Sequence, residues 1–163
     1  MEEEQIKEGV PWAYFDGASQ NNKASAGIVI HLNNRHTLKA SIGLGNGSNN
    51  YAELSTLKLL LCWLIHKNTL TVQIFGDSLN VIKWINGHSS CHNYVLQTLL
   101  EEIEHVKLSF NSFSIHHKYM ERNDMAHKLS KDGIEQVLSS WRIVEENNGE
   151  NHVSNQPPYA QNA

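Results

Sequence analysis

The sequence predicts an α/β fold with a five-stranded mixed sheet, three antiparallel strands followed by two parallel ones, flanked by helices. Three short apolar segments near the amino terminus are separated by polar turns, which is typical of an antiparallel meander. Two later apolar segments are each reached through a helical pattern, which favours parallel pairing. With 163 residues and 40% hydrophobic content, the chain is long enough to bury the core of one domain.

The meander is expected at residues 12–16, 26–32 and 37–44. Aromatic and small residues run up to Asp16, and we expect the chain to turn at Gly17 and to form a polar loop over residues 20–25. Asn33 and Asn34 then predict a turn that joins the second and third strands as a hairpin. Taken alone, Asp16 is either a turn residue or a carboxylate presented at the exit of a strand.

The clearest helix comes next, because leucines recur on one face of a helical pattern. These are Leu57, Leu60, Leu61 and Leu64. Extending this stripe backwards reaches Glu53, and Asn49 or Asn50 is placed to cap the helix. A carboxylate at the edge of a core-facing stripe is costly unless it meets a cation or hydrogen-bond donors. Glu53 is therefore either such a partnered group or a residue that merely complements the helix dipole.

The fourth strand is expected over residues 70–75 and ends at Gly76 and Asp77. A helix follows at once, with Ser78 as its cap and Gly87 at its end. Asp77 therefore lies at the carboxyl end of a strand and beside a helix amino terminus, where open α/β sheets place their active sites. The structural alternative is that Asp77 is a second capping residue.

Three more elements complete the expected domain: a helix over residues 94–107, a strand over residues 110–116 and a last helix from Asp124, with Asn123 as its cap. We expect the domain to span residues 11–141. A polar leader over residues 1–10 precedes it, and a flexible polar tail over residues 142–163, rich in Asn, Glu and Gln, follows it.

The net charge of −4 is unevenly distributed. Residues 1–8 carry −3 and residues 145–163 another −3, so residues 9–144 carry +2, a mildly basic body compatible with weak phosphate binding. Cys62 and Cys91 predict free thiols in a reducing compartment. Because the amino terminus is acidic and no apolar run reaches membrane-spanning length, we expect an intracellular protein, nuclear or cytoplasmic, that is not secreted and has no membrane partner.

Four short motifs follow one another along the chain. They are Phe-Asp-Gly-Ala-Ser at residues 15–19, Asn-Tyr-Ala-Glu-Leu at 50–54, Phe-Gly-Asp-Ser at 75–78 and Asn-Asp-Met-Ala-His-Lys-Leu-Ser-Lys-Asp-Gly at 123–133. Together they resemble the type 1 ribonuclease H domain, in the reverse-transcriptase-associated form of plant retroelements, over residues 11–135. The resemblance implies a ribonuclease H-like fold and hydrolysis of the RNA strand of RNA–DNA hybrids with two divalent ions, Mg²⁺ or Mn²⁺.

The resemblance assigns the family's first three catalytic metal ligands to Asp16, Glu53 and Asp77. It implies that Asp16 bridges both ions, while Glu53 and Asp77 hold the ion that faces the leaving group. Phosphodiester cleavage develops negative charge on the attacking and leaving oxygens, and two cations roughly 4 Å apart stabilise both. Carboxylates are the hard oxygen ligands that Mg²⁺ prefers.

The fourth ligand position departs from the family pattern, in which Asn is followed four residues later by Asp. Counting from Asn123 places His127 there, whereas Asp124 is three residues early, about 60° short of a full helical turn. An imidazole can coordinate a metal but suits Mn²⁺ better than Mg²⁺, so we expect His127 to be a catalytic metal ligand of a weakened or Mn²⁺-preferring enzyme. The alternative is that His127 is an exposed helix residue of an inactive copy.

Further contacts follow from the resemblance. The implied nucleic-acid-binding residues are Ser19, Asn21, Asn22, Asn50 and Ser78, with Asn21 or Asn22 at a 2′-hydroxyl group. Residues 87–93 contain no Lys or Arg where some family members carry a basic protrusion. We therefore expect low affinity for the hybrid unless a fused or associated nucleic-acid-binding or reverse transcriptase module contributes.

A second histidine also matches the family. His117, ten residues before His127, matches the mobile-loop His that assists product release, and His116 is the competing candidate. The alternative for either histidine is a structural role at the end of the strand. Two function classes remain open: a metal-dependent endonuclease, and a catalytically inactive ribonuclease H-like module of retroelement origin that binds nucleic acid or acts as a spacer. Whether His127 faces the three carboxylates discriminates between them.

Overall fold

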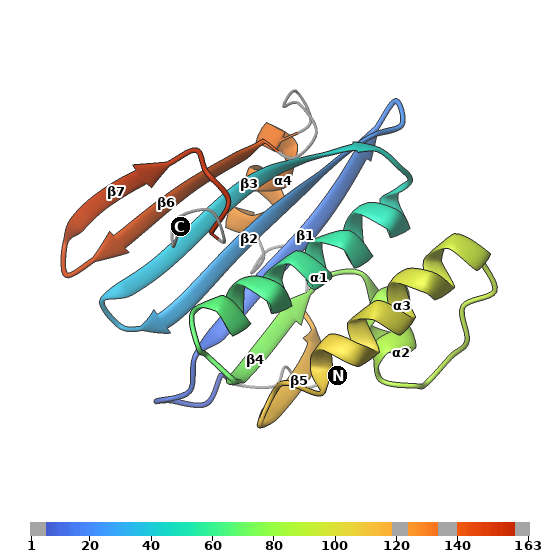
Figure 1. Cartoon of the computed structure of the whole chain (residues 1–163), viewed down its shortest axis with the longest axis horizontal. Helices are drawn as coiled ribbons and strands as arrows, with labels where there is room; N and C mark the ends of the chain where they lie inside the picture. Colours follow the sequence, from blue (N-terminus) through green and yellow to red (C-terminus); the bar gives the residue numbers. More distant parts are fainter. Residues whose placement is uncertain (1–5, 119–123, 134–139, 159–163) are drawn as a thin grey trace.

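The computed structural model describes residues 6–118, 124–133 and 140–158, and within them one sheet contains seven strands. The strand order is β5-β4-β1-β2-β3-β6-β7 (Figure 1). The strands are β1 (Trp12–Gln20), β2 (Lys23–Asn33), β3 (His36–Asn46), β4 (Thr71–Gly76), β5 (Ser112–His117), β6 (Trp141–Asn147) and β7 (Glu150–Ser154). The helices are α1 (Asn49–His66), α2 (Leu79–Ile85), α3 (Tyr94–Lys107) and α4 (Asp124–Gly133).

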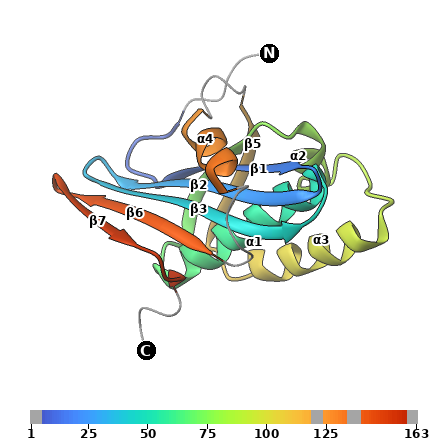
Figure 2. The same cartoon turned by 90° about the horizontal axis from the view of Figure 1, so that it is seen from above.

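The sheet is mixed, as predicted: β1, β2 and β3 pair antiparallel, while β1, β4 and β5 pair in parallel. Helices α1 and α3 lie on one face and α4 lies on the other (Figure 2). The four leucines of the predicted stripe in α1 are fully buried between this helix and the sheet. Because burying one such side chain contributes about 1.5–3 kcal/mol, this contact fixes α1 firmly against β1 and β2.

The prediction of five strands is wrong, because β6 and β7 form where a flexible polar tail is expected from residue 142 onwards. Strand β6 pairs antiparallel with the edge of β3 and buries Trp141 and Ile143. The Trp141 ring packs edge-on against Trp63 of α1, with ring centroids 6.0 Å apart. Oε2 of Glu145 lies 2.5 Å from Nε2 of His36 in β3. An acidic residue that suggests a solvated tail is therefore paired with a residue of the neighbouring strand.

The start of the sheet also differs from expectation. Gly17 does not turn the chain; β1 continues to Gln20, and Gln20 pairs with Lys23 across a two-residue hairpin. Asn21 and Asn22 form its turn with φ values of 53° and 63°. Positive φ at both central residues is what a tight hairpin of type I′ requires, and Asn tolerates it well. A tight hairpin therefore replaces the polar loop predicted over residues 20–25.

The helix ends are capped by side chains, although not all by the predicted ones. Ser48, rather than Asn49 or Asn50, caps α1 by accepting a hydrogen bond from the backbone N–H of Tyr51 at 3.2 Å. Ser78 caps α2 as predicted, and Gly87 follows that helix with a φ of 74°. The predicted cap of α4, Asn123, lies outside the described residues.

Part of the predicted leader is anchored to the sheet. The backbone N–H of Lys7 donates to Oε1 of Gln73 at 2.8 Å, and Nε2 of Gln73 donates to the carbonyl of Val10 at 3.3 Å. Residues 1–5 and 159–163 lie outside the described part of the chain, and Pro158 is buried. Cys62 and Cys91 are free thiols. Among the described helices, none is long and apolar enough to cross a membrane.

Candidate metal centre

Three carboxylates from three elements meet at one end of the sheet. Asp16 is in β1, Glu53 is in the second turn of α1, and Asp77 directly follows β4. Each offers one oxygen, and these three oxygens lie within 4.8 Å of one another. The three predicted acidic ligands are therefore brought together, and among the described residues they form the cluster suited to a metal ion.

Two local features bring the carboxylates together. The parallel register pairs Phe15 with Gly76, which places the next residues, Asp16 within β1 and Asp77 just after β4, side by side. Gly17 lies against the backbone of α1: an added Cβ would be 2.3 Å from the carbonyl carbon of Ala52. Only glycine allows so close an approach, and this approach brings the following residue of α1, Glu53, towards Asp16.

The electrostatics of the cluster suit a cation. Glu53 is only 7% exposed, and its Oε2 atom has no hydrogen-bond partner in the structure. Burial, followed by the negative charge of Asp16, raises the pKa of Glu53 well above its ordinary value. Burial and then Asp16 also raise the pKa of Asp77 to about 6. Crowded carboxylates without a counter-charge resist ionisation, so a divalent cation would relieve both the repulsion and the unpaired oxygen.

His127 of α4 faces this cluster, as the endonuclease hypothesis requires. Its Nδ1 atom lies 2.8 Å from Oδ2 of Asp16, and its side chain is 35% exposed. With Nδ1–H as the donor to the carboxylate, the lone pair of the neutral ring is on Nε2. The imidazole therefore meets the carboxylates through a hydrogen bond to Asp16, and its direct coordination of a metal stays a prediction.

Ser130 is a site residue that the sequence did not identify. Its hydroxyl is buried, lies 3.1 Å from Oδ2 of Asp16 and lies 2.7 Å from the backbone carbonyl of His127. The sequence feature that could have identified Ser130 is its position three residues after His127, which places both side chains on one face of the helix. Serine three residues along a helix is common, however, and its contact with Asp16 depends on how α4 packs on the sheet.

The two other candidate histidines lie at the end of β5. Nε2 of His117 is 3.2 Å from the backbone carbonyl oxygen of Asp77, so this ring approaches the metal centre. His116 lies beside Phe75 instead, with ring centroids 5.5 Å apart. The structure places His117 within a strand rather than on a loop, so its assistance to product release stays a prediction.

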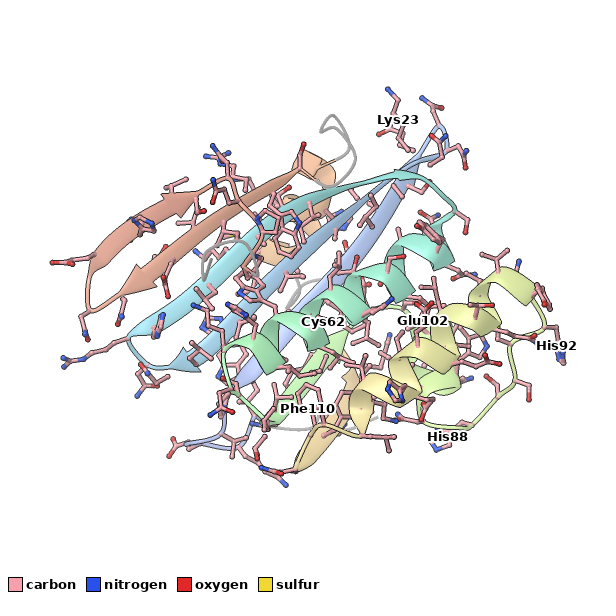
Figure 3. All side chains as sticks on the ribbon, in the orientation of Figure 1. Lys23, Cys62, His88, His92, Glu102 and Phe110 are labelled. Carbon is pink, nitrogen blue, oxygen red and sulfur yellow. The ribbon has the colours of Figure 1, made fainter. Side chains whose placement is uncertain are left out.

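The β1–β2 hairpin carries three of the predicted nucleic-acid-binding residues, Ser19, Asn21 and Asn22. The backbone N–H of Ser19 donates to Oδ1 of Asn49 at 2.9 Å, and the N–H of Gly47 donates to the carbonyl of Asn22 at 2.9 Å. These bonds tie the β1–β2 hairpin to the segment before α1. Asn21 is exposed at the hairpin, whose tip Figure 3 marks with Lys23.

The two remaining candidates differ in what holds them. Asn50 is half-buried in the first turn of α1. Ser78 is half-buried as well, and its hydroxyl is engaged at the cap of α2, 3.4 Å from the backbone N–H of Val81. Asn49 is a further residue of this region, because its side chain accepts a hydrogen bond from the backbone of Ser19 in the hairpin. The sequence predicted only a capping role for it.

Comparison with known proteins places this geometry in context. A family model described as reverse transcriptase-like matches residues 14–133. Among curated proteins, none matches the chain. RNase H1 from the halophilic archaeon Halobacterium salinarum NRC-1 is similar in structure, with a TM-score of 0.74 and 25% identity, covering 79% of this chain and 100% of that one.

Two further solved structures are informative. LC11-RNase H1, isolated from compost and solved in complex with an RNA/DNA hybrid, has a TM-score of 0.69 and 25% identity, covering 79% of this chain and 99% of that one. The protease-reverse transcriptase of prototype foamy virus has a TM-score of 0.62 and 20% identity, covering 82% of this chain and 22% of that one, and shows the fold alone. The predicted ribonuclease H-like α/β fold is thereby confirmed. Because the family model covers most of the chain, this protein belongs to the reverse transcriptase-like family, whose fold here is that of ribonuclease H.

Proposed function

We propose that this protein is a metal-dependent endonuclease that hydrolyses the RNA strand of RNA–DNA hybrids. The observation that carries the proposal is the cluster of Asp16, Glu53 and Asp77, in which a buried carboxylate oxygen of Glu53 has no hydrogen-bond partner among the residues that the structure describes. Support for the substrate comes from the likeness to LC11-RNase H1, which was solved with an RNA/DNA hybrid.

The donor set fits hard divalent cations, Mg²⁺ or Mn²⁺. Asp16, Glu53 and Asp77 supply carboxylate oxygens, which these ions prefer, and the three oxygens are close enough together to hold a cation. Bound there, the cations would stabilise charge on the attacking and leaving oxygens and make water acidic enough to ionise near neutral pH. In this proposal Asp16, the carboxylate whose charge raises the pKa of both neighbours, would hold the cations together with Glu53 and Asp77.

The α4 side of the centre distinguishes this chain from its family's pattern. His127 contributes an imidazole where that pattern has Asp, so the site has three formal negative charges rather than four. Its Nε2 atom carries the lone pair for coordination while Nδ1–H remains on Asp16. We infer weaker attraction for the second cation and a preference for Mn²⁺ over Mg²⁺, because nitrogen ligands suit Mn²⁺ better.

Substrate recognition in this proposal uses asparagines at the β1–β2 hairpin and in the first turn of α1. Asn21, Asn22 and Asn50 offer amide donors and acceptors that can meet 2′-hydroxyl groups, which distinguish RNA from DNA. Lys23 is exposed at the hairpin tip, and His88 and His92 are exposed between α2 and α3 (Figure 3). This sparse positive charge predicts weak binding, and we propose that a fused or associated nucleic-acid-binding or reverse transcriptase module, as expected for a retroelement-derived chain, adds affinity.

The decisive test is cleavage of a labelled RNA–DNA hybrid with Mg²⁺ and Mn²⁺ side by side. We expect cleavage of the RNA strand with Mn²⁺, slower cleavage with Mg²⁺ and none with a chelator. Single-stranded and duplex DNA should resist, and hybrid binding should weaken steeply with salt because phosphate contacts release counterions. Efficient cutting of plain duplex DNA would reject the proposed substrate and favour a general nuclease.

One observation favours a second candidate function. The α4 residue that faces Asp16 is His127, whose imidazole adds no negative charge to the site as an aspartate would. In this alternative the domain binds hybrid or single strands without cutting them. If neither the natural chain nor His127→Asp cleaves with either ion while both still bind hybrid, the binding module is the correct function.

A further inference from the structure

We propose that Ser130 is a positioning residue for Asp16, holding the central carboxylate of the metal centre in the orientation that binds cations. This inference rests on the proposed function and names a residue that the catalytic set above does not contain. Its hydroxyl approaches Oδ2 of Asp16 at 3.1 Å, the same oxygen that Nδ1 of His127 approaches at 2.8 Å. Helix α4 therefore presents two donors to one oxygen.

The two donors differ in how firmly they are held. The His127 side chain is 35% exposed, whereas Ser130 is fully buried beneath it. If the imidazole turns aside to admit substrate, its hydrogen bond to Asp16 is strained or lost. The hydroxyl of Ser130 then remains as the donor on Oδ2, so the carboxylate keeps its orientation.

The hydroxyl has one proton and two acceptors. The backbone carbonyl of His127 is nearer, at 2.7 Å, but the carboxylate of Asp16 is ionic and therefore the stronger acceptor. A proton shared in this way couples the orientation of Asp16 to the backbone of the helix that carries His127. The two sides of the centre are thus linked through Ser130.

Ser130 itself is fixed by the sheet beneath α4. Gly27 of β2 has no side chain at the contact: an added Cβ would lie 1.9 Å from the carbonyl oxygen of Ala126 and 2.5 Å from the backbone nitrogen of Ser130. The hydroxyl of Ser25 donates to the carbonyl of Ser130. The backbone of Ser130 is therefore held on both its N–H and its C=O sides, which is what a positioning residue requires.

The test compares Mn²⁺ binding by the full chain and its variants, measured by electron paramagnetic resonance, with the Mn²⁺ dependence of hybrid cleavage. We expect Ser130→Ala to weaken Mn²⁺ binding about 10-fold, as loss of a hydrogen-bond partner of a metal ligand typically does. Cleavage at saturating Mn²⁺ should fall much less. Ser130→Cys nearly conserves volume but donates only weakly, so it is the variant to use if Ser130→Ala folds poorly. We expect it to weaken Mn²⁺ binding to a similar extent.

The matched control is Ser41→Ala, which removes a buried hydroxyl of β3 that donates to the carbonyl of Leu129 in α4, two strands away from Asp16 in the sheet. It should lower the melting temperature by a few degrees and leave Mn²⁺ binding within about twofold. Equal losses of Mn²⁺ binding in the Ser41 and Ser130 variants would show a purely structural role and overturn the inference, as would unchanged binding in both Ser130 variants. If the natural chain neither binds Mn²⁺ nor cleaves, the proposed function fails and the inference fails with it.

Discussion

The carboxylate side and the α4 side of the metal centre are built in different ways. Asp16, Glu53 and Asp77 come from β1, α1 and the end of β4, elements joined by strand pairing and by the buried face of α1. His127 and Ser130 come from α4, a helix of ten residues that rests on the opposite face of the sheet.

This difference separates two properties of the site. The carboxylate side supplies the negative charge, so substitutions there should decide whether a cation binds at all. The α4 side supplies two donors that contact Asp16, so substitutions there should decide which cation is preferred and how well it is held.

The largest effect is expected from Asp77→Asn on the carboxylate side. An amide is a poorer ligand than a carboxylate, and because loss of an outer partner alone costs 10–100-fold, loss of a ligand should reduce hybrid cleavage by more than about 100-fold. Circular dichroism should show an intact fold. Glu102→Gln, which removes an exposed acid on α3 (Figure 3), is the control and should leave cleavage unchanged. Equal cleavage by the natural chain and Asp77→Asn would remove Asp77 from the mechanism.

A pair of glycine substitutions compares the two sides directly. Gly17→Ala forces a Cβ to 2.3 Å from the backbone of α1, and Gly27→Ala forces one to 1.9 Å from the backbone of α4. Overpacking typically costs about 1–3 kcal/mol. Because α1 forms the main core, Gly17→Ala should reach the upper end of this range or exceed it, whereas Gly27→Ala should mainly displace α4.

Both variants should lose cleavage, but urea unfolding should separate them. We expect Gly27→Ala to retain most of its folding free energy and measurable Mn²⁺ binding, since the three carboxylates come from elements other than α4. If Gly27→Ala unfolds the protein as extensively as Gly17→Ala does, α4 is part of the folding core and the proposed division between the two sides is wrong.

The same division explains what could be predicted from the sequence. Asp16 and Asp77 stand out because each follows a short apolar run and precedes or follows a glycine, although β1 in fact continues past Asp16. Glu53 stands out on an apolar stripe. These are local patterns, and the resemblance then supplied their common role. The contact of Ser130 with Asp16 is not local, because it depends on the depth at which α4 rests on Gly27.

The missed strands have a related cause. Residues 142–154 read as solvated because their charges and amides outnumber their apolar residues. Their order comes from partners far along the chain: Trp141 meets Trp63, and Glu145 and Glu146 meet His36 and Lys39 of β3. The residue pattern within 142–154 does not indicate which distant residues these side chains will contact. Composition alone therefore favoured a flexible polar tail.

An intermediate effect is expected from His127→Asp, which restores the fourth acid of the family pattern. Cleavage with Mg²⁺ should rise by about 10-fold or more, while the ratio of Mn²⁺ to Mg²⁺ activity falls, because the added carboxylate attracts a hard cation. His127→Asn, which adds no charge, is the matched control and should not gain Mg²⁺ activity. If His127→Asp changes neither rate nor metal preference, His127 does not occupy the fourth ligand position.

The smallest effect concerns the stability of the metal-free protein, where the crowded carboxylates act against folding. Burial and the charge of Asp16 raise the pKa of Asp77 to about 6, from 3.8 for an unperturbed Asp. Between about pH 4 and pH 6 the folded chain therefore holds a proton that the unfolded chain releases. Stability must fall as the pH rises through this window, and the penalty is complete above it.

Asp77→Asn removes that penalty. In the presence of a chelator at pH 7.5, we expect the variant to be more stable than the natural chain by about 1 kcal/mol, a value reduced because solvent screens a half-buried group, or about 2–4 °C in melting temperature. At pH 4 the advantage should nearly vanish, since both chains are then neutral at residue 77. Saturating Mn²⁺ at pH 7.5 should reverse the order, because a cation that binds the folded natural chain stabilises it while the variant binds more weakly. A melting difference that is independent of both pH and Mn²⁺ would show that Asp77 carries no excess charge in the centre, and that its role is only structural.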